Sequence, residues 1–167
     1  MKIFKFILIS LIFLSFNLET KEYDAKFGLI TKLMKFVNFS TPPESNRIDT
    51  FGDAVFKDQI ELKIKEGEKI NGSIISGTVL KEVSEIKNSM IVFVPKKHSS
   101  ELKEIIKYVS DKNIIVICEQ KSGAQMGAIF NILIENNKLV FEVNKTEANK
   151  KGISINSRIL QLAKKVF

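Results

Sequence analysis

The sequence predicts an α/β fold: a single domain with a mixed sheet, a parallel βαβ core, a C-terminal β-hairpin and a closing helix. Two continuous runs of apolar, mostly β-branched residues, Met90–Val94 and Ile114–Cys118, are typical of strands buried on both faces. A helical pattern with short links lies between them, which favours a right-handed crossover between parallel strands. Further along the chain, Asn136-Asn137 separates two more apolar runs, and because asparagine tolerates positive φ this pair indicates a hairpin.

Length and composition agree with one compact domain. The chain has 167 residues, of which 44% are hydrophobic and 27% charged. A domain near this size removes roughly 70% of its unfolded-chain surface from water, so it needs neither a disulfide nor a metal to fold. The same balance excludes a disordered chain, a collagen-like fibre and a polytopic membrane protein.

The first half of the domain contains a helix followed by shorter elements. Within residues 23–37, the apolar positions Phe27, Ile30, Leu33, Met34 and Val37 share one helical face. Pro42-Pro43 ends this segment, because proline lacks an amide donor and restricts the residue before it. The elements expected next are an extended piece at Ile48–Phe51, a helix or extended amphipathic segment at Phe56–Lys65, a strand at Ile74–Val79 and a short helix at Leu80–Lys87.

The second half begins with the crossover helix, which either Ser99 or Ser100 can cap. The inner face of this helix holds Leu102, Ile105, Ile106 and Val109. The C-terminal elements are strands at Met126–Ile134 and Leu139–Val143 and helices at Asn144–Lys151 and Ser157–Val166, the last capped by Asn156 or Ser157.

Residues 1–20 indicate an export signal. Lys2 and Lys5 precede an apolar run from Phe6 to Phe16, which matches the n-region and h-region of a secretory signal peptide. A helix that crosses the membrane needs about 20 apolar residues, so this run is short for a permanent anchor. No small-x-small cleavage site follows it, and the signal is either cleaved or retained; the alternative is a buried N-terminal helix or strand. We expect a periplasmic protein whose α/β domain covers residues 21–167.

Charge and residue counts remove several kinds of chemistry. The formal net charge is +7, but lysines alternate with acids, as in KEYDAK and KEGEK, and no basic stripe is interleaved with aromatic residues. We therefore expect no nucleic-acid binding. Cys118 is the only cysteine and His98 the only histidine, which excludes an intramolecular disulfide and leaves little room for Cys/His zinc sites or Ser-His-Asp triads. We expect no metal and no cofactor.

Two glycine-containing stretches do not predict nucleotide binding. The Gly72–Gly77 stretch lacks the lysine and hydroxyl residue of a phosphate-binding loop. The Gly123–Gly127 stretch leads into a strand rather than a helix, so we expect a turn or bulge that lets the backbone approach a neighbour.

The side-chain chemistry of three single residues predicts where they lie in the fold. We expect His98 to lie at the surface and Cys118 to behave as a small buried hydrophobe. Glu119 follows a buried strand and should lie at the carboxyl edge of the sheet, where α/β proteins bind ligands. It has no evident second carboxylate in register, so an enzyme that uses Glu119 is the weakest of the function classes.

Three stretches of the C-terminal half form a recognisable pattern: Ser122-Gly123 with Gly127–Glu135, then Asn137–Asn144, then Ala148 with Gly152–Ala163. In these stretches the chain resembles the YfiR family of exported proteins. The family pattern combines a "GG-x-I-x-F" strand, a "(I/L)RF-E-(I/V)-N" strand and a final "A…G(L/I)-x-(I/V)-S-S-x-(L/I)-L-x-LA" segment. KFVNFSTPPE, Phe51-Gly52-Asp53 and Asn71-Gly72 agree more loosely, and the resemblance spans about Ala25 to Val166.

The resemblance implies a periplasmic α/β protein without catalytic activity that represses an inner-membrane diguanylate cyclase or sensor protein. It further implies that an outer-membrane protein sequesters the repressor, and we expect a homodimer. By motif position, the partner-binding residues would be Phe130, Glu142 and Ala148. Ordinary core packing is the alternative for Phe130, whereas Glu142 alternates with Phe141 and Val143 and should point outward.

The chain departs from the family pattern at two places. Where some members carry a cysteine pair flanking the first of these strands, this chain has Ala124 and Asn131, so redox control through such a pair cannot operate. The tryptophan that precedes a proline in the family is also missing near Asn38–Ser40. The alternative function is a periplasmic module that binds a small ligand or an envelope component near Pro95–His98 and Glu119–Gly123.

Overall fold

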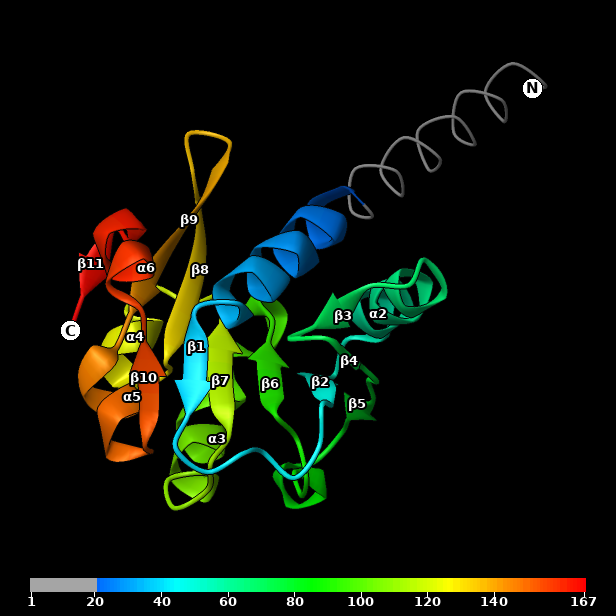
Figure 1. Cartoon of the computed structure of the whole chain (residues 1–167), viewed down its shortest axis with the longest axis horizontal. Coiled ribbons are helices and arrows are strands. Elements are labelled where there is room, and N and C mark those ends of the chain that lie inside the picture. The colour runs from blue at the N-terminus through cyan, green and yellow to red at the C-terminus, as the bar shows by residue number, and fades with distance from the viewer. Residues whose placement is uncertain (1–20) are drawn as a thin grey trace, which may run out of the picture.

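A seven-stranded mixed sheet forms the centre of the molecule (Figure 1). The structure is a computed structural model that describes residues 21–167, so the predicted export signal at residues 1–20 lies outside the described residues. The order across the sheet is β11-β9-β8-β7-β6-β2-β5. These strands are β2 (Ile48–Phe51), β5 (Val79–Leu80), β6 (Ile91–Val94), β7 (Ile115–Cys118), β8 (Phe130–Glu135), β9 (Lys138–Val143) and β11 (Lys165–Val166). All neighbours are parallel except β8 and β9, which form an antiparallel hairpin.

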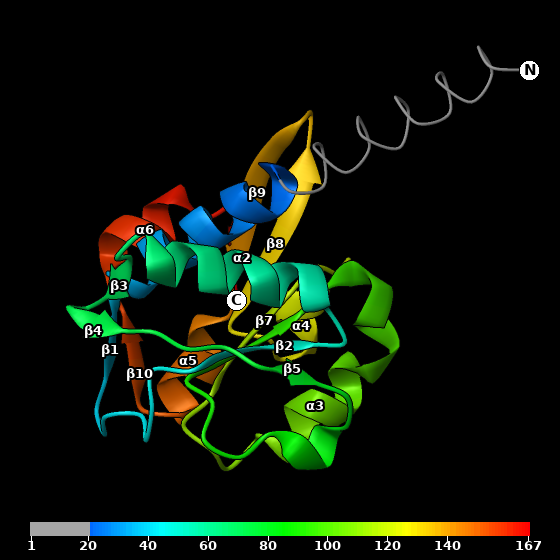
Figure 2. The ribbon, with the colours of Figure 1, turned by 90° about the vertical axis from the view of Figure 1, so that its right-hand side faces the viewer.

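Helices cover both faces of the sheet (Figure 2). A helix at residues 21–34 and α2 (Ala54–Lys65) lie on one face, and α3 (Leu102–Tyr108) lies on the other. The shorter helices are η1 (Val83–Glu85), η2 (Lys96–Glu101), α4 (Gly123–Met126), α5 (Lys145–Lys150) and α6 (Ser157–Leu162). Two small pairs complete the fold: β1 (Val37–Phe39) with β10 (Ile153–Ile155), and β3 (Lys69–Ile70) with β4 (Ser73–Ile74).

Two hydrophobic cores lie on the two faces of the sheet. The larger core contains the apolar face predicted for the N-terminal helix, with Phe27, Ile30, Leu33 and Met34 all buried. The ring of Phe56, from α2, lies 4.3 Å from that of Phe93 between centroids. The smaller core, beneath α3, contains Phe51, Leu80, Leu102, Ile105 and Val116. Because each central strand alternates its side chains between these cores, its sequence is apolar throughout.

The predicted βαβ core and the predicted hairpin are both confirmed. The α3 helix connects β6 to β7, and these strands pair in parallel with Ile91 opposite Ile115. In the hairpin, Asn136 and Asn137 have φ values of 50° and 59°, which is the left-handed conformation that a two-residue turn requires. The extended piece at Ile48–Phe51 is β2, and the segment left open between helix and strand is the helix α2.

The structure differs from the prediction between residues 71 and 87. The expected strand at Ile74–Val79 is divided between β4 and β5, and the expected helix at Leu80–Lys87 is only the single turn η1. Gly77 lies between the two short strands, where a Cβ atom would meet the carbonyl oxygen of Ile48 at 2.9 Å. The chain therefore passes against β2 at this point, and the alternating pattern does not continue as one strand.

The first residues of two further elements, β8 and α3, were predicted incorrectly. Met126 belongs to the helical turn α4, so β8 starts only at Phe130. Ser99 and Ser100 lie inside η2, and the residue that precedes α3 is Glu101, which makes no side-chain cap. Such ends depend on how the chain leaves the sheet, which the local sequence pattern does not record.

The last segment is a short helix followed by a strand rather than a helix to Val166. Asn156 caps α6, accepting a hydrogen bond from the backbone N–H of Arg158, and the helix ends at Leu162. The backbone N–H groups of Lys164 and Phe167 then donate to the carbonyl oxygens of Phe141 and Val143. These bonds place β11 beside β9, so the backbone groups of β9 bind the chain terminus instead of facing solvent.

Lys151 offers a test of how the second half of the domain is held together. Its ammonium group donates hydrogen bonds to the carbonyl oxygens of Val109 and Lys112 at the end of α3, and burial lowers the pKa of Lys151. Lys151→Met should reduce the free energy of unfolding by about 1–3 kcal/mol, because two carbonyl groups lose a charged donor. Urea denaturation measures this difference.

The matched control is Lys150→Met, one residue earlier. The side chain of Lys150 is 66% exposed and pairs only with Glu147 at 3.2 Å. A surface pair of this kind contributes about 0–1 kcal/mol. Equal effects of the two substitutions would show that Lys151 does not hold α3 and α5 together.

Candidate functional site

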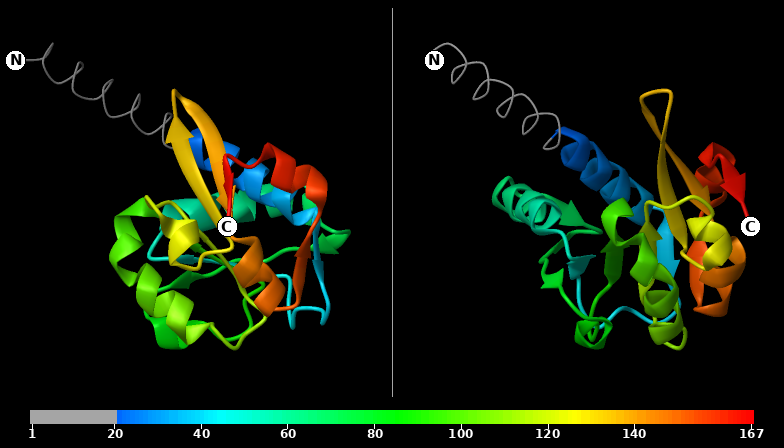
Figure 3. Two further views of the ribbon diagram at one scale, coloured as in Figure 1. Left: turned by 90° about the vertical axis from the view of Figure 1, so that its left-hand side faces the viewer. Right: turned by 180° about the vertical axis from the view of Figure 1, so that it is seen from behind.

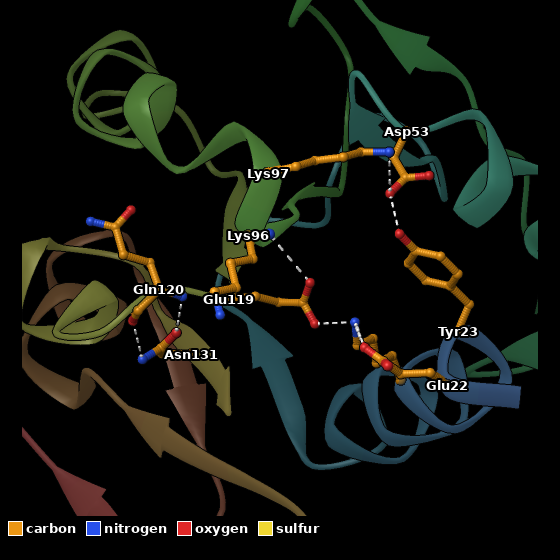
Figure 4. Close-up of polar contacts among 9 residues, drawn as sticks. Glu22, Tyr23, Asp53, Lys96, Lys97, Glu119, Gln120 and Asn131 are labelled. Atoms are coloured by element: carbon orange, nitrogen blue, oxygen red, sulfur yellow. Dashed lines mark hydrogen bonds and ion pairs between the residues drawn. The ribbon is translucent and has the colours of Figure 1, made fainter. Parts of the chain in front are cut away.

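A group of polar side chains in contact with one another lies where the parallel strands end, beside the N-terminal helix (Figure 4). Asp53 follows β2, Lys96 and Lys97 follow β6, and Glu119 follows β7. Parallel strands bring their carboxyl ends to one edge of a sheet, which is where open α/β folds bind ligands. Tyr23 and Lys26 reach the same edge from the helix at residues 21–34.

Glu119 forms a buried ion pair with Lys26. The nitrogen–oxygen distance is 2.6 Å, and the side chains of Lys26 and Glu119 are only 6% and 10% exposed. Glu22 approaches the same ammonium group at 2.5 Å, and the backbone N–H of Lys96 donates to Glu119 at 3.4 Å. Burial raises the pKa of Glu119, an effect that Lys26 offsets in part. Burial alone would lower the pKa of Lys26, but Glu119 and Glu22 outweigh it and the pKa is raised.

Asp53 forms a second buried cluster at the same edge. It caps α2, with Oδ1 accepting from the backbone N–H of Phe56 at 3.1 Å. Its Oδ2 accepts from the Tyr23 hydroxyl at 2.5 Å and lies 3.2 Å from the Lys97 ammonium. Burial works against the charged form, but these three donors outweigh burial and hold the pKa of Asp53 below its usual value.

The two carboxylates at this edge differ in how readily they take up a proton. Three donors hold Asp53 in its charged form, whereas burial raises the pKa of Glu119 despite its ion pair with Lys26. Within residues 21–167 no group of three or more His, Cys, Asp or Glu residues could hold a metal ion. The predicted position of Glu119 at the carboxyl edge is confirmed, but its partner Lys26, which also pairs with Glu22, comes from a helix whose placement no local pattern indicates.

A hollow of about 290 Å³ opens beside the Lys26–Glu119 pair. One wall is the N-terminal helix, and the opposite wall is β8 where it extends beyond β7. Its lining residues are Glu22, Lys26, Lys96, Glu119, Lys121, Ile132, Leu133 and Ile134. The hollow therefore combines aliphatic side chains from the hairpin with charged groups of both signs.

The predicted partner-binding residues do not form one surface. Phe130 and Ala148 are fully buried in the larger core, so the core-packing alternative for Phe130 holds. Glu142 faces away from Phe141 and Val143, as their alternation predicts, but it is only 8% exposed and accepts a hydrogen bond from the Asn131 amide at 2.9 Å, so it does not face solvent as expected. Its register partners on the two neighbouring strands, Asn131 of β8 and Lys165 of β11, flank it on both sides. A role in partner binding for these three residues stays a prediction, and Phe130 and Ala148 could exert it only through the surface above them.

Asn131, at one of the positions where some family members have cysteine, is fully hydrogen-bonded. Its Oδ1 accepts from the Gln120 backbone N–H at 3.1 Å and from the Cys118 thiol at 3.3 Å, and its amide donates to the Gln120 carbonyl and to Glu142. Burial raises the pKa of Cys118 to about 12, as fits the predicted buried hydrophobe. The close approach predicted for the glycine stretch occurs at Gly123, where a Cβ atom would lie 2.2 Å from the Cys118 sulfur.

His98 is less exposed than predicted. It lies edge-on to the ring of Phe51 with 5.8 Å between ring centroids, and it fills the space beside Gly52, whose φ is +64°. The imidazole therefore packs against the loop that leads to Asp53.

Replacement of Asp53 by asparagine should test the polar contacts that hold the N-terminal helix. Asparagine also caps helices well, so Asp53→Asn keeps the cap and removes the charge. We expect the free energy of unfolding to fall by about 1.5–3 kcal/mol at pH 7. Because the folded-state pKa lies below the unfolded value near 3.8, this contribution is present above pH 3.8 and is lost as the pH falls through the folded pKa.

Denaturation of both proteins between pH 7 and pH 2.5 measures the difference. Asp58→Asn, at an exposed position of the same helix, is the control and should change stability by about 0.5 kcal/mol or less. A gap between Asp53→Asn and the parent protein that stayed constant down to pH 2.5 would contradict the role given to the Asp53 charge.

Three solved structures share this fold at low sequence identity. A conserved domain protein from Vibrio cholerae is 12% identical with a TM-score of 0.60, and the alignment covers 87% of this chain and 60% of that one. The ABC domain from Streptococcus pneumoniae in complex with L-Trp is 13% identical with a TM-score of 0.58, covering 82% and 59%. CD0873 from Clostridium difficile, a substrate-binding protein with adhesive properties, is 12% identical with a TM-score of 0.52, covering 74% and 55%. This chain thus spans 55–60% of their lengths, and at such identity they show the fold alone.

Among residues 21–167 no helix has the length and apolar character needed to cross a membrane. The model of the YfiR/HmsC-like family, DUF4154, matches residues 23–164, which is nearly all of the described chain. The chain therefore belongs to the YfiR/HmsC-like family.

Proposed function

We propose that this protein is a non-catalytic periplasmic regulator that binds and restrains a membrane enzyme of cyclic-di-GMP signalling. The observation that supports this proposal is the family match over residues 23–164. The expected partner is an inner-membrane diguanylate cyclase or sensor protein. An outer-membrane protein that sequesters the regulator, and a homodimer as its working form, belong to the same proposal.

Restraint of an enzyme requires only a difference in affinity for two states of that enzyme. A regulator that binds the inactive state more tightly shifts the population toward it. Shifting an equilibrium from 1:99 to 99:1 takes a ratio of about 10⁴ between the two affinities. Such restraint requires no chemical step. It is therefore compatible with carboxylates at the carboxyl edge that form ion pairs with lysines, Glu119 with Lys26 and Asp53 with Lys97.

The hairpin and the C-terminal segment lie side by side (Figure 3), because β11 pairs with β9. Ile134, Leu162 and Val166 are large apolar side chains exposed there. Phe130 and Glu142 lie in the buried part of the same hairpin, so substitutions at these predicted positions would alter the surface from beneath. The partner would contact these exposed apolar side chains.

Deletion of the gene should raise intracellular cyclic-di-GMP by about 5-fold or more, the lower end of allosteric coupling. Mass spectrometry of nucleotide extracts measures this change. Ile134→Asp and Leu162→Asp should fail to restore the low level, because a charge at the contact surface disrupts binding. The control is Ile74→Asp, an exposed apolar residue in the small β3–β4 hairpin, which should restore it. An unchanged nucleotide level after deletion would overturn the proposal.

A second candidate function is the binding of a small ligand at the carboxyl edge. The hollow of about 290 Å³ supports it, since small-molecule sites start near this volume. One protein of the same fold is in complex with L-Trp, and another is a substrate-binding protein.

Thermal unfolding in the presence of free L-amino acids, L-tryptophan included, tests this second function. A ligand at 100 times its Kd stabilises the folded state by about 2.7 kcal/mol, which corresponds to a rise in Tm of about 5–10 °C. Lys121→Ala, in the lining of the hollow, should reduce the shift, and Lys138→Ala, at the far end of the hairpin, should not. The absence of any shift at millimolar concentration would contradict this function.

A further inference from the structure

The outer half of β8 has an open edge. β7 pairs with β8 only through Ile117 opposite Phe130 and Cys118 opposite Asn131. Beyond Asn131 the hairpin continues past the end of β7, and Figures 1 and 3 show it projecting from the rest of the sheet. Within residues 21–167 no strand pairs with the stretch Ile132–Glu135 on this side.

The backbone groups of Ile134 point toward this open edge. In an antiparallel pair, opposite residues either bond to each other or both direct their backbone groups outward, in alternation. Phe141 and Val143 direct their carbonyl groups to the chain terminus, so their register partners Ile132 and Phe130 point away from β9. Ile134, two residues beyond Ile132, has the same orientation. It therefore offers an N–H and a C=O to an incoming strand.

A hollow lies on each face of this edge. The first, of about 290 Å³, is the one beside the N-terminal helix, where the side chains of Ile132 and Ile134 form part of the wall. The second, of about 360 Å³, lies on the opposite face and includes Glu135 and Glu142 in its wall. Lys121, Leu133 and Ile134 line both hollows. Since successive side chains of a strand point to opposite faces, a strand added here would place them alternately in the two hollows.

Among residues 21–167, the charged groups around the edge that form no ion pair are mainly positive. Lys26 and Lys164 already have carboxylate partners, namely Glu119 and Glu135. Lys96, Lys121 and Lys165, which border the hollows, form no ion pair with any carboxylate of residues 21–167. The second hollow also contains the negative charge of Glu142, whose carboxylate accepts a hydrogen bond from the Asn131 amide.

We propose that the edge of β8 at Ile132–Glu135 binds an extended segment of a partner protein as an additional strand. The segment alternates apolar residues, which pack on Ile132 and Ile134 in the first hollow, with acidic residues, which enter the second hollow beside Lys121 and Lys165. Main-chain hydrogen bonds would supply affinity and the two hollows specificity, as in other cases of strand addition. A compact small molecule would fill only one of the two hollows.

The test uses two blocked heptapeptides, one of alternating glutamate and valine and one of alternating lysine and valine. Each is titrated into the ¹⁵N-labelled protein while amide chemical shifts are recorded. The glutamate peptide should shift the amides of Ile132–Glu135 and Lys121, and the lysine peptide should bind about tenfold more weakly or not at all. Equal binding of both peptides, shifts confined to another surface, or no shift at millimolar peptide would each overturn the proposal.

Two variants separate strand addition from ordinary surface contact. Ile134→Pro removes the N–H that faces the open edge without removing a bond to β9, and it should weaken the glutamate peptide about tenfold or more. The matched control, Ile134→Thr, keeps the N–H and should retain most of the affinity. If Ile134→Pro bound as well as Ile134→Thr, no strand would be added at this edge. Lys121→Glu, at an exposed position, should weaken binding even if the proline variant folds poorly.

This inference names a binding mode for the partner of the proposed function and rests on that function for the identity of the protein that supplies the segment. The two can fail separately. Peptide binding at the β8 edge with no cyclic-di-GMP phenotype would keep strand addition and remove the regulatory role. A clear phenotype without peptide binding would keep the regulator and place its partner on another surface.

Discussion

The placement of the N-terminal helix against the carboxyl edge of the sheet is the constraint on which the candidate site depends. The apolar face of the helix supplies most of the free energy for this placement, because full burial of each of Phe27, Ile30 and Leu33 contributes about 1.5–3 kcal/mol. The Lys26–Glu119 pair adds little net stability, since removing each ion from water costs several kcal/mol that the attraction between them must first offset. The ion pair and the Tyr23–Asp53 hydrogen bond instead select one position of the helix along the edge. A helix held only by apolar contacts could slide or rotate, and the hollow beside β8 would then have no defined wall.

Elements of the domain that depend on local pattern could be predicted from the sequence, whereas pairings between distant segments could not. The strands β6 and β7 and the turn at Asn136-Asn137 each have a local physical cause, in continuous apolar character or in tolerance of positive φ. The strand β11 has no such signal, because Lys165 and Val166 become a strand only when Phe141 and Val143 offer their carbonyl groups. The unexpected burial of Glu142 follows from this, since alternation along β9 indicates the face of its side chain but not the residue of β11 that flanks it.

The candidate site likewise combines residues whose positions the local sequence predicts with residues whose positions depend on distant segments. Asp53 after Gly52 has a local signal, because aspartate is a favoured helix cap and the preceding glycine permits the turn. Glu119 was expected at the carboxyl edge because it follows a buried strand. Tyr23 and Lys26 could not be assigned to that edge, since helical periodicity indicates which face of a helix is buried but not which strands it meets. The open edge of β8 could not be predicted from the sequence either, because it exists only where β7 ends before the hairpin does.

An open strand edge is a hazard that natural proteins usually reduce by shortening the edge, covering it or placing charges on it. At the two ends of this sheet, β5 and β11 are only two residues long, which limits pairing with other chains. The edge of β8 is not shortened: the hairpin extends past β7, and close to its turn Ile134 is 53% exposed. Lys121 and Lys165 lie close by, and their repulsion of basic segments would limit indiscriminate pairing while leaving acidic ones free to approach. An edge that extends past its neighbour, is partly apolar and is flanked by lysines without an ion-pair partner within residues 21–167 suits selective strand pairing better than general solubility. The buried network of Asn131, Gln120 and Glu142 holds the base of the hairpin rigid, so an incoming strand would meet a preformed edge and lose less free energy to ordering it.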